Sequence, residues 1–410
     1  MTTQQKAFLP YGRQSIDERD IAAVVDVLRG DWLTTGPMVD AFEADFAVAS
    51  GAAYAISCSS GTAALHMAAL ALDFQPGHYA VVPAVTFSAT ANALRYCGSE
   101  VIIADVDPAT GLLTTDTAMA AIHRAVSDGI DLSRIRAFFP VHLNGQCVEI
   151  LELAELAAQT NCSLVFDACH AIGSDWYDLD GNSHKVGANL GGAMSTFSLH
   201  PVKTVTMGEG GVVTTDDADC AERLRRLRSH GITRDPACFV EKSQAFDSDG
   251  EANPWYQELV ELGYNYRASD VHCALGRSQL TRLDAFVSRR RELAARYDSL
   301  LTSYGNFLTP VARTASCNPA WHLYAVLIDF ALIEKDRATV MRQLAAEGIG
   351  TQVHYVPLHR QPYYRQRYGR TKLPGADAYY ERCLSLPLYP TMEVDDVDRV
   401  VDALAGVLSK

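Results

Sequence analysis

Residues 54–72 have the sequence YAISCSSGTAALHMAALAL. The first five residues, Tyr54–Cys58, are a short apolar run of the kind that forms a buried strand. Ser59-Ser60-Gly61-Thr62 then supplies turn and helix-cap residues. The Ala- and Leu-rich segment that follows, to Leu72, favours a helix. The stretch therefore predicts a strand, a turn and a helix in succession, which is the repeating unit of α/β proteins.

The same alternation continues on the C-terminal side of this unit. Helical patterns pass through Ala91 and Leu94 and lie around Leu151–Ala158. Strands interleaved with helices predict an α/β fold around a largely parallel, buried sheet. The further strands that we expect are Tyr79–Val82, Glu100–Ala104, Arg136–Val141, Ser163–Phe166, Ala193–Ser198 and Gly211–Thr215.

The pattern changes from about Val271, where a smaller α/β unit is expected. We predict a large domain over residues 1–265, which includes an N-terminal segment 1–50, and a small C-terminal domain over residues 266–410. The polar segment Asp235–Glu258 is predicted to be a surface loop, and loops of this length are often functional. The elements expected in the C-terminal part are one or two helices in Leu275–Tyr304, a strand near Leu323–Ile328, a helix Arg337–Glu347, a strand Gly350–Tyr355 and a helix Val394–Leu408.

Composition excludes several classes of protein. The 35 Lys+Arg against 49 Asp+Glu give a net charge of −14, which argues against a nucleic-acid binder but not against a phosphorylated small substrate. The 10 Cys include no C-x-x-C pair, so neither a zinc ribbon nor a redox dithiol is expected, and no metal site is predicted. Without a secretory leader or a run of 18 apolar residues, we expect a cytoplasmic protein with reduced thiols and no membrane contact.

The most informative stretch is Ser195–Thr204, STFSLHPVKT, followed by Gly208-Glu209-Gly210-Gly211. It places Lys203 on a loop between two apolar strands. Most lysines are simply solvated, but this one lies at a strand end of an α/β sheet, where ligands tend to bind. A lysine desolvated there loses its proton more readily and can form a Schiff base with an aldehyde.

An aspartate, Asp167, ends another apolar strand. In that position it could cap a following helix. It could also face the ring nitrogen of pyridoxal phosphate, where a carboxylate keeps the nitrogen protonated and preserves the ring as an electron sink. His170, three residues further on, could orient this carboxylate.

Three other signals fit a phosphate-bearing aromatic cofactor. Gly61 and Thr62 begin a predicted helix, and backbone N–H groups at a helix N-terminus bind phosphate. Ser198 can donate a hydroxyl to the same phosphate, and Phe87, just after a strand, can stack on a ring. Each of these residues alone is more often a cap or a core residue.

In this combination and order, the chain resembles the sugar aminotransferases of the DegT/DnrJ/EryC1/StrS family over nearly its whole length. The family implies the fold type I of pyridoxal-phosphate-dependent transferases, with a large domain built on a mixed, mostly parallel sheet and a smaller C-terminal α/β domain. The landmarks are Ser60-Gly61-Thr62-Ala63-Ala64-Leu65, Pro83…Thr86-Phe87, Asp167…His170-Ala171-Ile172-Gly173, Ser198…Lys203…Gly208-Glu209-Gly210-Gly211 and Gly263-Tyr264-Asn265-Tyr266-Arg267.

Within the family, the chain is most similar to the branch that serves pseudaminic acid synthesis. That resemblance implies transfer of an amino group, with L-glutamate as the donor, to C4 of a UDP-linked 4-keto-6-deoxy-N-acetylhexosamine. The segments that carry it are Pro10–Ile16, Asp31–Pro37, Ser229–Pro236, Pro254-Trp255-Tyr256 and Val353–Pro357.

The resemblance also assigns roles to residues. It implies that Lys203 forms the Schiff base and later carries the proton, and that Asp167 pairs with the pyridine nitrogen. Phe87 stacks on the ring, Gly61, Thr62 and Ser198 hold the phosphate, and His170 belongs to the cofactor site. Asn265 reaches across a homodimer interface to the partner's cofactor phosphate. The positions that line the nucleotide-sugar site are Tyr11, Asp31, Trp32, Leu33, Thr34, Gln352, Val353, His354 and Tyr355.

One of these positions departs from the family pattern. Asp31 stands where a basic residue can occur in relatives, which is unfavourable beside a diphosphate.

Other functions remain open at this point. The landmarks fit aminotransferases for dTDP- or GDP-linked keto-sugars equally well. Sugar dehydratases of the family carry His at the Schiff-base position. The presence of Lys203 there argues against a dehydratase. A regulatory or DNA-binding protein is disfavoured by the net charge of −14 and by the lack of a basic helix-turn-helix. A Rossmann dehydrogenase would need G-x-G-x-x-G after the first strand, and the chain has none there.

Overall fold

The computed structural model describes residues 7–188 and 194–409. Their largest sheet has seven strands in the order β1-β9-β8-β5-β4-β2-β3. Strand β9 is antiparallel to both of its neighbours, and the other neighbouring pairs are parallel. The prediction of an α/β fold with a mixed, mostly parallel sheet is therefore confirmed. The strand bounds are β1 Tyr54–Cys58, β9 Gly211–Thr215, β8 Met194–Ser198, β5 Ser163–Asp167, β4 Ile135–Phe138, β2 Tyr79–Pro83 and β3 Glu100–Ala104.

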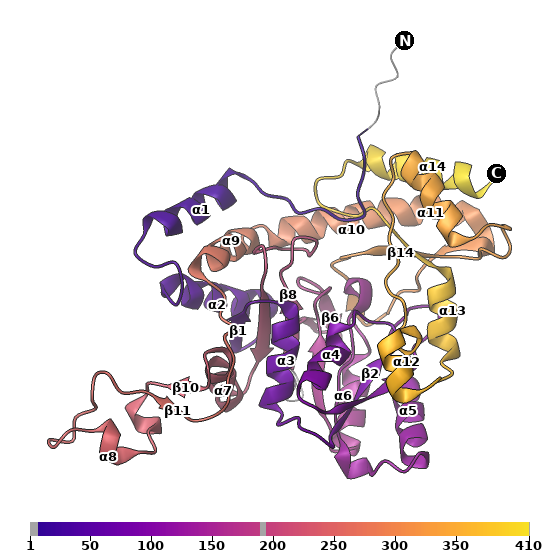
Figure 1. The fold of residues 1–410 in the computed structure, drawn as a ribbon. Helices are drawn as coiled ribbons and strands as arrows, with labels where there is room; N and C mark the ends of the chain where they lie inside the picture. The colour runs from indigo at the N-terminus through magenta and orange to yellow at the C-terminus, as the bar shows by residue number, and fades with distance from the viewer. Residues whose placement is uncertain (1–6, 189–193, 410) are drawn as a thin grey trace.

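This sheet is buried on both faces. Successive side chains of a strand point to opposite faces, yet four or more consecutive residues are buried in β1, β2, β3, β5, β8 and β9. Helices supply this cover on the two sides of the sheet (Figure 1). Their bounds are α2 Pro37–Ser50, α3 Gly61–Ala71, α4 Ala89–Tyr96, α5 Thr115–Ser127, α6 Ile150–Gln159 and α7 Ala218–Arg228.

The C-terminal part builds a second hydrophobic cluster around a three-stranded antiparallel sheet of order β12-β14-β15. Long helices cover it, and Leu9 from the N-terminal side joins the same cluster. The division of the chain at residues 265 and 266 stays a prediction. The bounds are β12 Leu308–Pro310, β14 Tyr324–Ile328, β15 Cys383–Leu386, α10 Leu283–Leu301, α11 Arg337–Ala346, α12 Pro362–Tyr368, α13 Pro374–Arg382 and α14 Val394–Leu408.

Smaller elements complete the fold. Helix α9 packs on α1 and α2, and a small sheet of order β13-β6-β7 lies apart from the larger sheets. The predicted helical region Leu275–Tyr304 is thus two helices, α9 and α10, and Ala193 of a predicted strand lies outside the described residues. The bounds are α1 Glu18–Arg29, α9 Asp270–Leu280, β6 Asp175–Tyr177, β7 Ser183–Lys185 and β13 Cys317–Asn318.

The predicted strand Gly350–Tyr355 is wrong. Its residue Gln352 makes only an isolated antiparallel bridge to Ser385, and the preceding Ile349 makes one to Leu9. Each of these two pairings lasts for one residue only, so the segment forms no continuous β-ladder with a neighbouring strand. Residues 353–355 line a cavity instead.

The segment predicted as an irregular loop, Asp235–Glu258, forms part of a projecting arm, which we define as residues 232–259. A short antiparallel pair, β10 Ile232–Thr233 and β11 Glu258–Leu259, forms its base, and helix α8 Lys242–Ala245 lies near its tip. The arm extends away from the body of the molecule at the lower left of Figure 1.

Three global features bear on the chemistry. All ten cysteines are free thiols. Over the described residues, no helix is long and apolar enough to span a bilayer, and no group of three or more His, Cys, Asp or Glu side chains is placed to hold a metal ion.

Candidate active site

A cavity of 560 Å³ lies where strands β5 and β8 end. Ligands of open α/β sheets bind in this position, beyond the carboxyl ends of the strands. The cavity brings together most of the residues that the sequence analysis singled out. They are Tyr11, Gly61, Thr62, Phe87, Asp167, His170, Ser198, Lys203, Gln352, Val353, His354 and Tyr355.

Lys203 lies in a tight turn after β8, where its backbone N–H donates to the carbonyl of His200 at 2.8 Å. Burial lowers the pKa of its ammonium group, and the neighbouring Cys169 and Asp167 act in the opposite direction. A neutral amine is the nucleophilic form of lysine. The turn therefore places a reactive amine in the cavity.

Asp167 ends β5, and both of its carboxylate oxygens accept hydrogen bonds. Oδ2 accepts from Thr90 Oγ1 at 2.7 Å, and Oδ1 accepts from the backbone N–H of Cys169 at 3.1 Å. No hydrogen bond joins His170 to this carboxylate among the described residues, so the expectation that His170 orients it has to be corrected. Thr90, on the first turn of α4, takes that place.

His170 instead belongs to a second chain of hydrogen bonds. The backbone N–H of Asn144 donates to its Nδ1 at 3.3 Å, which puts the ring proton on Nε2, 3.0 Å from the hydroxyl of Tyr355. Burial holds the pKa of His170 well below its ordinary value, so the ring is neutral. The Tyr355 oxygen accepts the Nε2 proton, which leaves its own proton for a ligand in the cavity.

A phosphate-sized cradle lies at the N-terminus of α3. Ser60 caps this helix by accepting from the N–H of Ala63 at 3.1 Å, so the expected capping role is present as well. A Cβ at Gly61 would stand 2.8 Å from Cβ of Ser198. Only glycine lets the helix start approach Ser198 so closely, and it leaves free N–H groups beside a hydroxyl.

Two residues of the site escaped the sequence analysis. Thr90 looks like an ordinary polar position of a helix until the fold brings it to Asp167. His322 lines the cavity, is only 4% exposed, and its buried Nδ1 has no hydrogen-bond partner among the described residues. The one available signal was its position beside an apolar strand, and a lone histidine there is more often structural.

Five predicted residues lie outside the cavity. Asp31, Trp32, Leu33 and Thr34 follow α1 on an exposed connection, which touches α9 through a bridge between Thr34 and Ser269. Asn265 is exposed beyond α7 and bridges Ser229. Their predicted roles in binding stay predictions.

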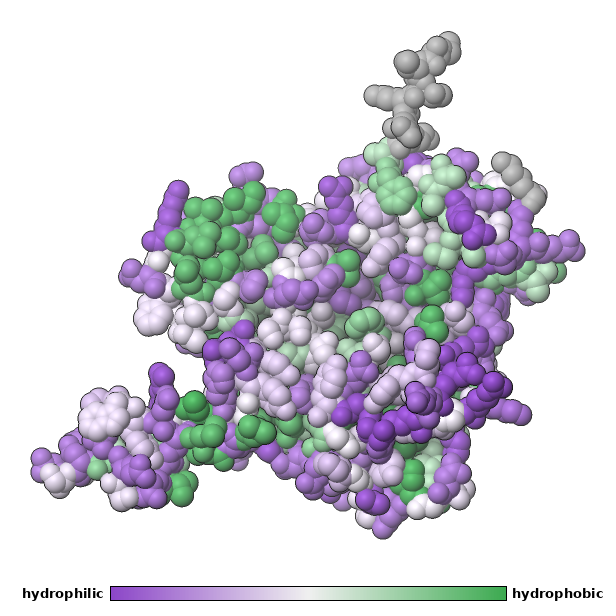
Figure 2. All heavy atoms as spheres, viewed as in Figure 1, coloured by the Kyte–Doolittle hydropathy of each residue, from purple (hydrophilic) through white to green (hydrophobic). Residues whose placement is uncertain are grey.

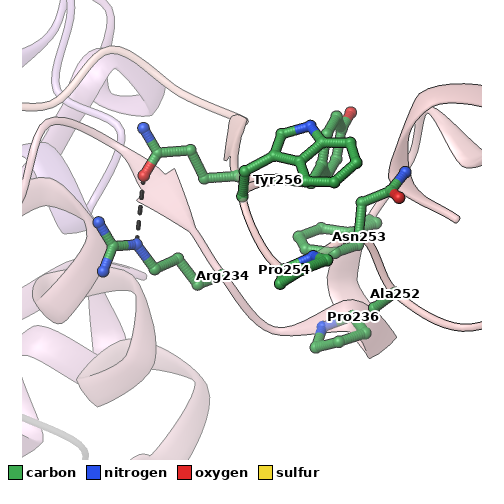
Figure 3. Close-up of a pocket in the computed structure, with 9 residues that line it drawn as sticks. Arg234, Pro236, Ala252, Asn253, Pro254 and Tyr256 are labelled. Atoms are coloured by element: carbon green, nitrogen blue, oxygen red, sulfur yellow. Dashed lines mark hydrogen bonds between the residues drawn. The ribbon is translucent and has the colours of Figure 1, made fainter.

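The arm holds a separate cavity of 520 Å³, which shares no lining residue with the main one. Arg234 and Tyr256 lie on opposite walls of it, and Nε of Arg234 donates to Oε1 of Gln257 at 3.2 Å (Figure 3). Trp255 beside it is 77% exposed. The arm therefore carries a solvated surface outside the cavity that holds Lys203.

Comparison with known proteins shows which family this cavity belongs to. The family model of the DegT/DnrJ/EryC1/StrS aminotransferases matches residues 14–405. The chain belongs to this family. The family membership and the placement of Lys203 together make the protein a pyridoxal-phosphate-dependent sugar aminotransferase.

Several family members are similar over almost the whole chain. The spore coat polysaccharide biosynthesis protein SpsC of Bacillus subtilis is 33% identical over 411 residues, which cover 100% of this chain and 99% of that protein. The structure of Helicobacter pylori PseC, an aminotransferase involved in pseudaminic acid biosynthesis, superposes with a TM-score of 0.84 at 25% identity and covers 98% of this chain and 99% of its own. The putative sugar aminotransferase Spr1654 of Streptococcus pneumoniae, in its PMP form, gives a TM-score of 0.84 at 26% identity, with 98% of each chain covered.

Pyridoxal 5′-phosphate is the cofactor of this family member, and the cavity fits it. The N–H groups at the start of α3 beside Gly61 could bind the phosphate, and the hydrogen-bonded carboxylate of Asp167 could pair with the ring nitrogen. The amine of Lys203 matches the aldehyde, and Phe87, which is 58% exposed, offers an aromatic face.

Proposed function

We propose that this aminotransferase moves an amino group from L-glutamate to C4 of a UDP-linked 4-keto-6-deoxy-N-acetylhexosamine, UDP-2-acetamido-2,6-dideoxy-β-L-arabino-hex-4-ulose. The observation that carries the proposal is the close structural likeness to PseC along the whole chain. The product would be the 4-amino sugar on the route to pseudaminic acid, made in the cytoplasm.

The lining of the cavity supports a bulky sugar substrate. Tyr11 and residues 352–355 lie in the same cavity as Lys203, although they come from the two ends of the chain. The ring of His354 lies 5.5 Å from that of Tyr11 and 4.9 Å from that of Tyr355. These rings form a wall that can hold a nucleotide-linked sugar with its keto carbon toward the lysine.

The mechanism follows from where the chain's own groups lie. The bound cofactor supplies an electron sink that makes a carbon–hydrogen bond next to the transferred nitrogen acidic. Asp167 holds the ring nitrogen in its protonated state, and Phe87 fixes the plane of the ring. Nζ of Lys203 takes the α-proton of glutamate and, in the second half of the reaction, delivers a proton to C4 of the sugar. A base positioned in this way contributes roughly 10²–10⁴-fold to the rate.

A homodimer is part of the proposal. Lys203 is the only Lys or Arg side chain among the described residues that line the cavity, and the cofactor and a nucleotide diphosphate together bring several negative charges. The missing counter-charges and donors would come from a second copy, with Asn265 at the partner's cofactor phosphate. An apolar surface over α1, which includes Ile21 and Leu28, is exposed in the single chain and could be buried by a second copy (Figure 2).

A substrate panel tests the proposal. The protein loaded with pyridoxal phosphate is incubated with L-glutamate and with UDP-, dTDP- or GDP-linked 4-keto-6-deoxy sugars, and mass spectrometry detects the amino sugar. The proposal predicts turnover with the UDP-linked N-acetylated sugar and none with a Lys203→Ala variant. Faster turnover of a dTDP- or GDP-linked sugar would reassign the substrate, and turnover by the variant would contradict the role of Lys203.

A further inference from the structure

Two buried hydroxyls stand in line behind the carboxylate of Asp167. Thr90 Oγ1 lies 2.7 Å from Oδ2 of Asp167, and Thr86 Oγ1 lies 2.7 Å from Thr90 Oγ1. Thr90 is fully buried, and Thr86 and Asp167 are 2% and 5% exposed. Solvent therefore does not compete for these bonds, and a hydrogen bond is electrostatically stronger in such a site than in water.

The direction of this chain is fixed by chemistry. An ionised carboxylate can only accept, so the single hydroxyl proton of Thr90 points to Asp167. The oxygen of Thr90 can then accept the proton of Thr86. The carbonyl of Phe87 is a competing acceptor for both hydroxyls, but it is 3.2 Å from each. The two shorter bonds define a relay that runs from Thr86 through Thr90 to Asp167.

Thr90 also has a local acceptor within reach, at a longer distance than the carboxylate. A threonine in the first turn of a helix commonly bonds to a backbone carbonyl three or four residues before it, which here is the carbonyl of Phe87. Its hydroxyl instead lies closer to a carboxylate 77 residues away in the chain. Bonds to an ionised acceptor are roughly twice as strong as neutral ones.

We propose that Thr90, supported by Thr86, is a positioning residue that fixes the rotation of the Asp167 carboxylate toward the cofactor ring. The N–H of Cys169 holds Oδ1 while the relay holds Oδ2, so the carboxylate is tied at both oxygens. Each oxygen keeps a lone pair for the ring nitrogen. Because Thr86 directly precedes Phe87, the same turn also places the ring-stacking face. The inference rests on the proposed roles of Asp167 and Phe87.

The test uses isosteric variants and two readouts other than turnover. The protein is freed of cofactor and then titrated with pyridoxal phosphate to obtain a dissociation constant. The absorbance of the loaded protein is next followed against pH, which gives the pKa of the imine between Lys203 and the cofactor. A protonated ring withdraws electrons from this imine and lowers its pKa, so a poorly held Asp167 should let the pKa rise.

Thr90→Val removes only the hydroxyl and should weaken cofactor binding by about 10-fold or more, since a hydrogen bond to a charged group is worth about 1.5–3 kcal/mol. It should also move the imine titration to higher pH. Thr90→Ser keeps the hydroxyl and should restore both values. The control is Thr196→Val, because Thr196 is equally buried and lies beside Asp167 in the sheet, but its hydroxyl bonds to the carbonyl of Phe166. This control should leave both readouts unchanged.

Wild-type values in Thr90→Val would overturn the relay, as would equal changes in Thr196→Val or no rescue by Thr90→Ser. If circular dichroism shows that Thr90→Val is unfolded, Thr86→Val replaces it and should shift both readouts in the same direction by a smaller amount. An unmoved Thr86→Val would then contradict the relay. A wild-type protein that binds no pyridoxal phosphate would contradict the cofactor site itself. That result differs from a wild type that binds the cofactor and a Thr90→Val variant that binds it equally well, which would contradict only the role of Thr90.

Discussion

The reactivity of Lys203 follows from the burial of its side chain in the cavity. The side chain is desolvated, and desolvation lowers the pKa of an ammonium group. The amine can therefore be deprotonated near neutral pH at a smaller free-energy cost than an exposed lysine needs. Neighbouring Cys169 and Asp167 limit this effect, because they raise the pKa of the ammonium group.

Asp167 should matter for chemistry more than for folding. Asp167→Ala removes the anion that we propose faces the ring nitrogen. Because breaking a buried ion pair costs about 3–5 kcal/mol, the glutamate half-reaction should slow by about 100-fold or more. Single-turnover absorbance after mixing with L-glutamate measures this rate. The variant should keep a native circular dichroism spectrum, and an unchanged single-turnover rate would show that the carboxylate does not serve the ring.

Gly61 should be irreplaceable for phosphate binding. In Gly61→Ala the new Cβ would meet Ser198 at 2.8 Å, so the start of α3 must shift away from the hydroxyl. We expect a loss of affinity for pyridoxal phosphate of about 10-fold, measured by equilibrium titration, because a lost hydrogen bond to a charged group is worth about 1.5–3 kcal/mol. Gly406→Ala in α14 is the control: its Cβ meets nothing within 4 Å, and it should bind the cofactor normally.

Helices and strands distribute the site over distant parts of the chain. Strands β5 and β8 present Asp167 and Lys203 at the same edge of the sheet, and α3 presents the phosphate cradle. Helix α10 fixes the C-terminal wall through Arg290, which is fully buried. Its Nη1 donates to the carbonyls of Trp321, His322 and Leu388 at 2.9–3.2 Å. This guanidinium thus holds the segment that carries His322 against the cavity.

Arg290→Met should destabilise the fold because three buried carbonyls lose a donor. We expect a loss of about 2–4 kcal/mol in the free energy of unfolding, since a buried polar group left unpaired costs about 1–3 kcal/mol. Denaturation in urea measures it. Arg225→Ala, which removes an exposed pair with Glu222, should change stability by less than about 0.5 kcal/mol. Equal effects of the two substitutions would refute the role given to Arg290.

Sequence patterns predict the elements whose signals are local. The apolar runs give most strands of the large sheet almost to the residue, as with Tyr54–Cys58 and Glu100–Ala104. The predicted strand Arg136–Val141 is an exception, because β4 is Ile135–Phe138 and Val141 makes only an isolated bridge. The predicted strand Gly350–Tyr355 failed because extended backbone becomes a strand only where a partner continues beside it. Lys203 and Asp167 were found because each stands at a strand end. Thr90 and His322 were not identified from the sequence, because their places in the site depend on contacts that the chain makes only after folding.

At the scale of the whole molecule, several histidines of the described residues are buried and neutral. Burial lowers the pKa of His142 to about 3, that of His354 to about 3 and that of His66 to about 4. His142 also accepts a hydrogen bond from the N–H of Val148, which protonation would break. In the unfolded chain these rings regain a pKa near 6.5. The unfolded state therefore binds more protons at mildly acidic pH.

Stability should consequently be complete above about pH 6.5 and fall as the pH drops toward the lowered pKa values of the folded state. Each such histidine contributes a slope of about 1.4 kcal/mol per pH unit. Urea denaturation between pH 7 and pH 5 measures the total slope. His142→Asn keeps a hydrogen-bond acceptor but cannot titrate. It should therefore reduce the dependence of the unfolding free energy on pH by about 1.4 kcal/mol per pH unit, the contribution of one proton. His123→Asn on the exposed side of α5 should not reduce it, and a slope unaffected by His142→Asn would contradict the assignment.

The central claim is that Lys203 in the cavity between β5, β8 and α3 is the residue that bonds pyridoxal phosphate. Reduction of the loaded protein with borohydride makes that bond permanent, and peptide mass spectrometry then locates the attached group. The account predicts a single phosphopyridoxyl group, on Lys203, that is absent when L-glutamate is added before the reductant and absent from Lys203→Ala. A label on another lysine, or equal labelling of the variant, would contradict it.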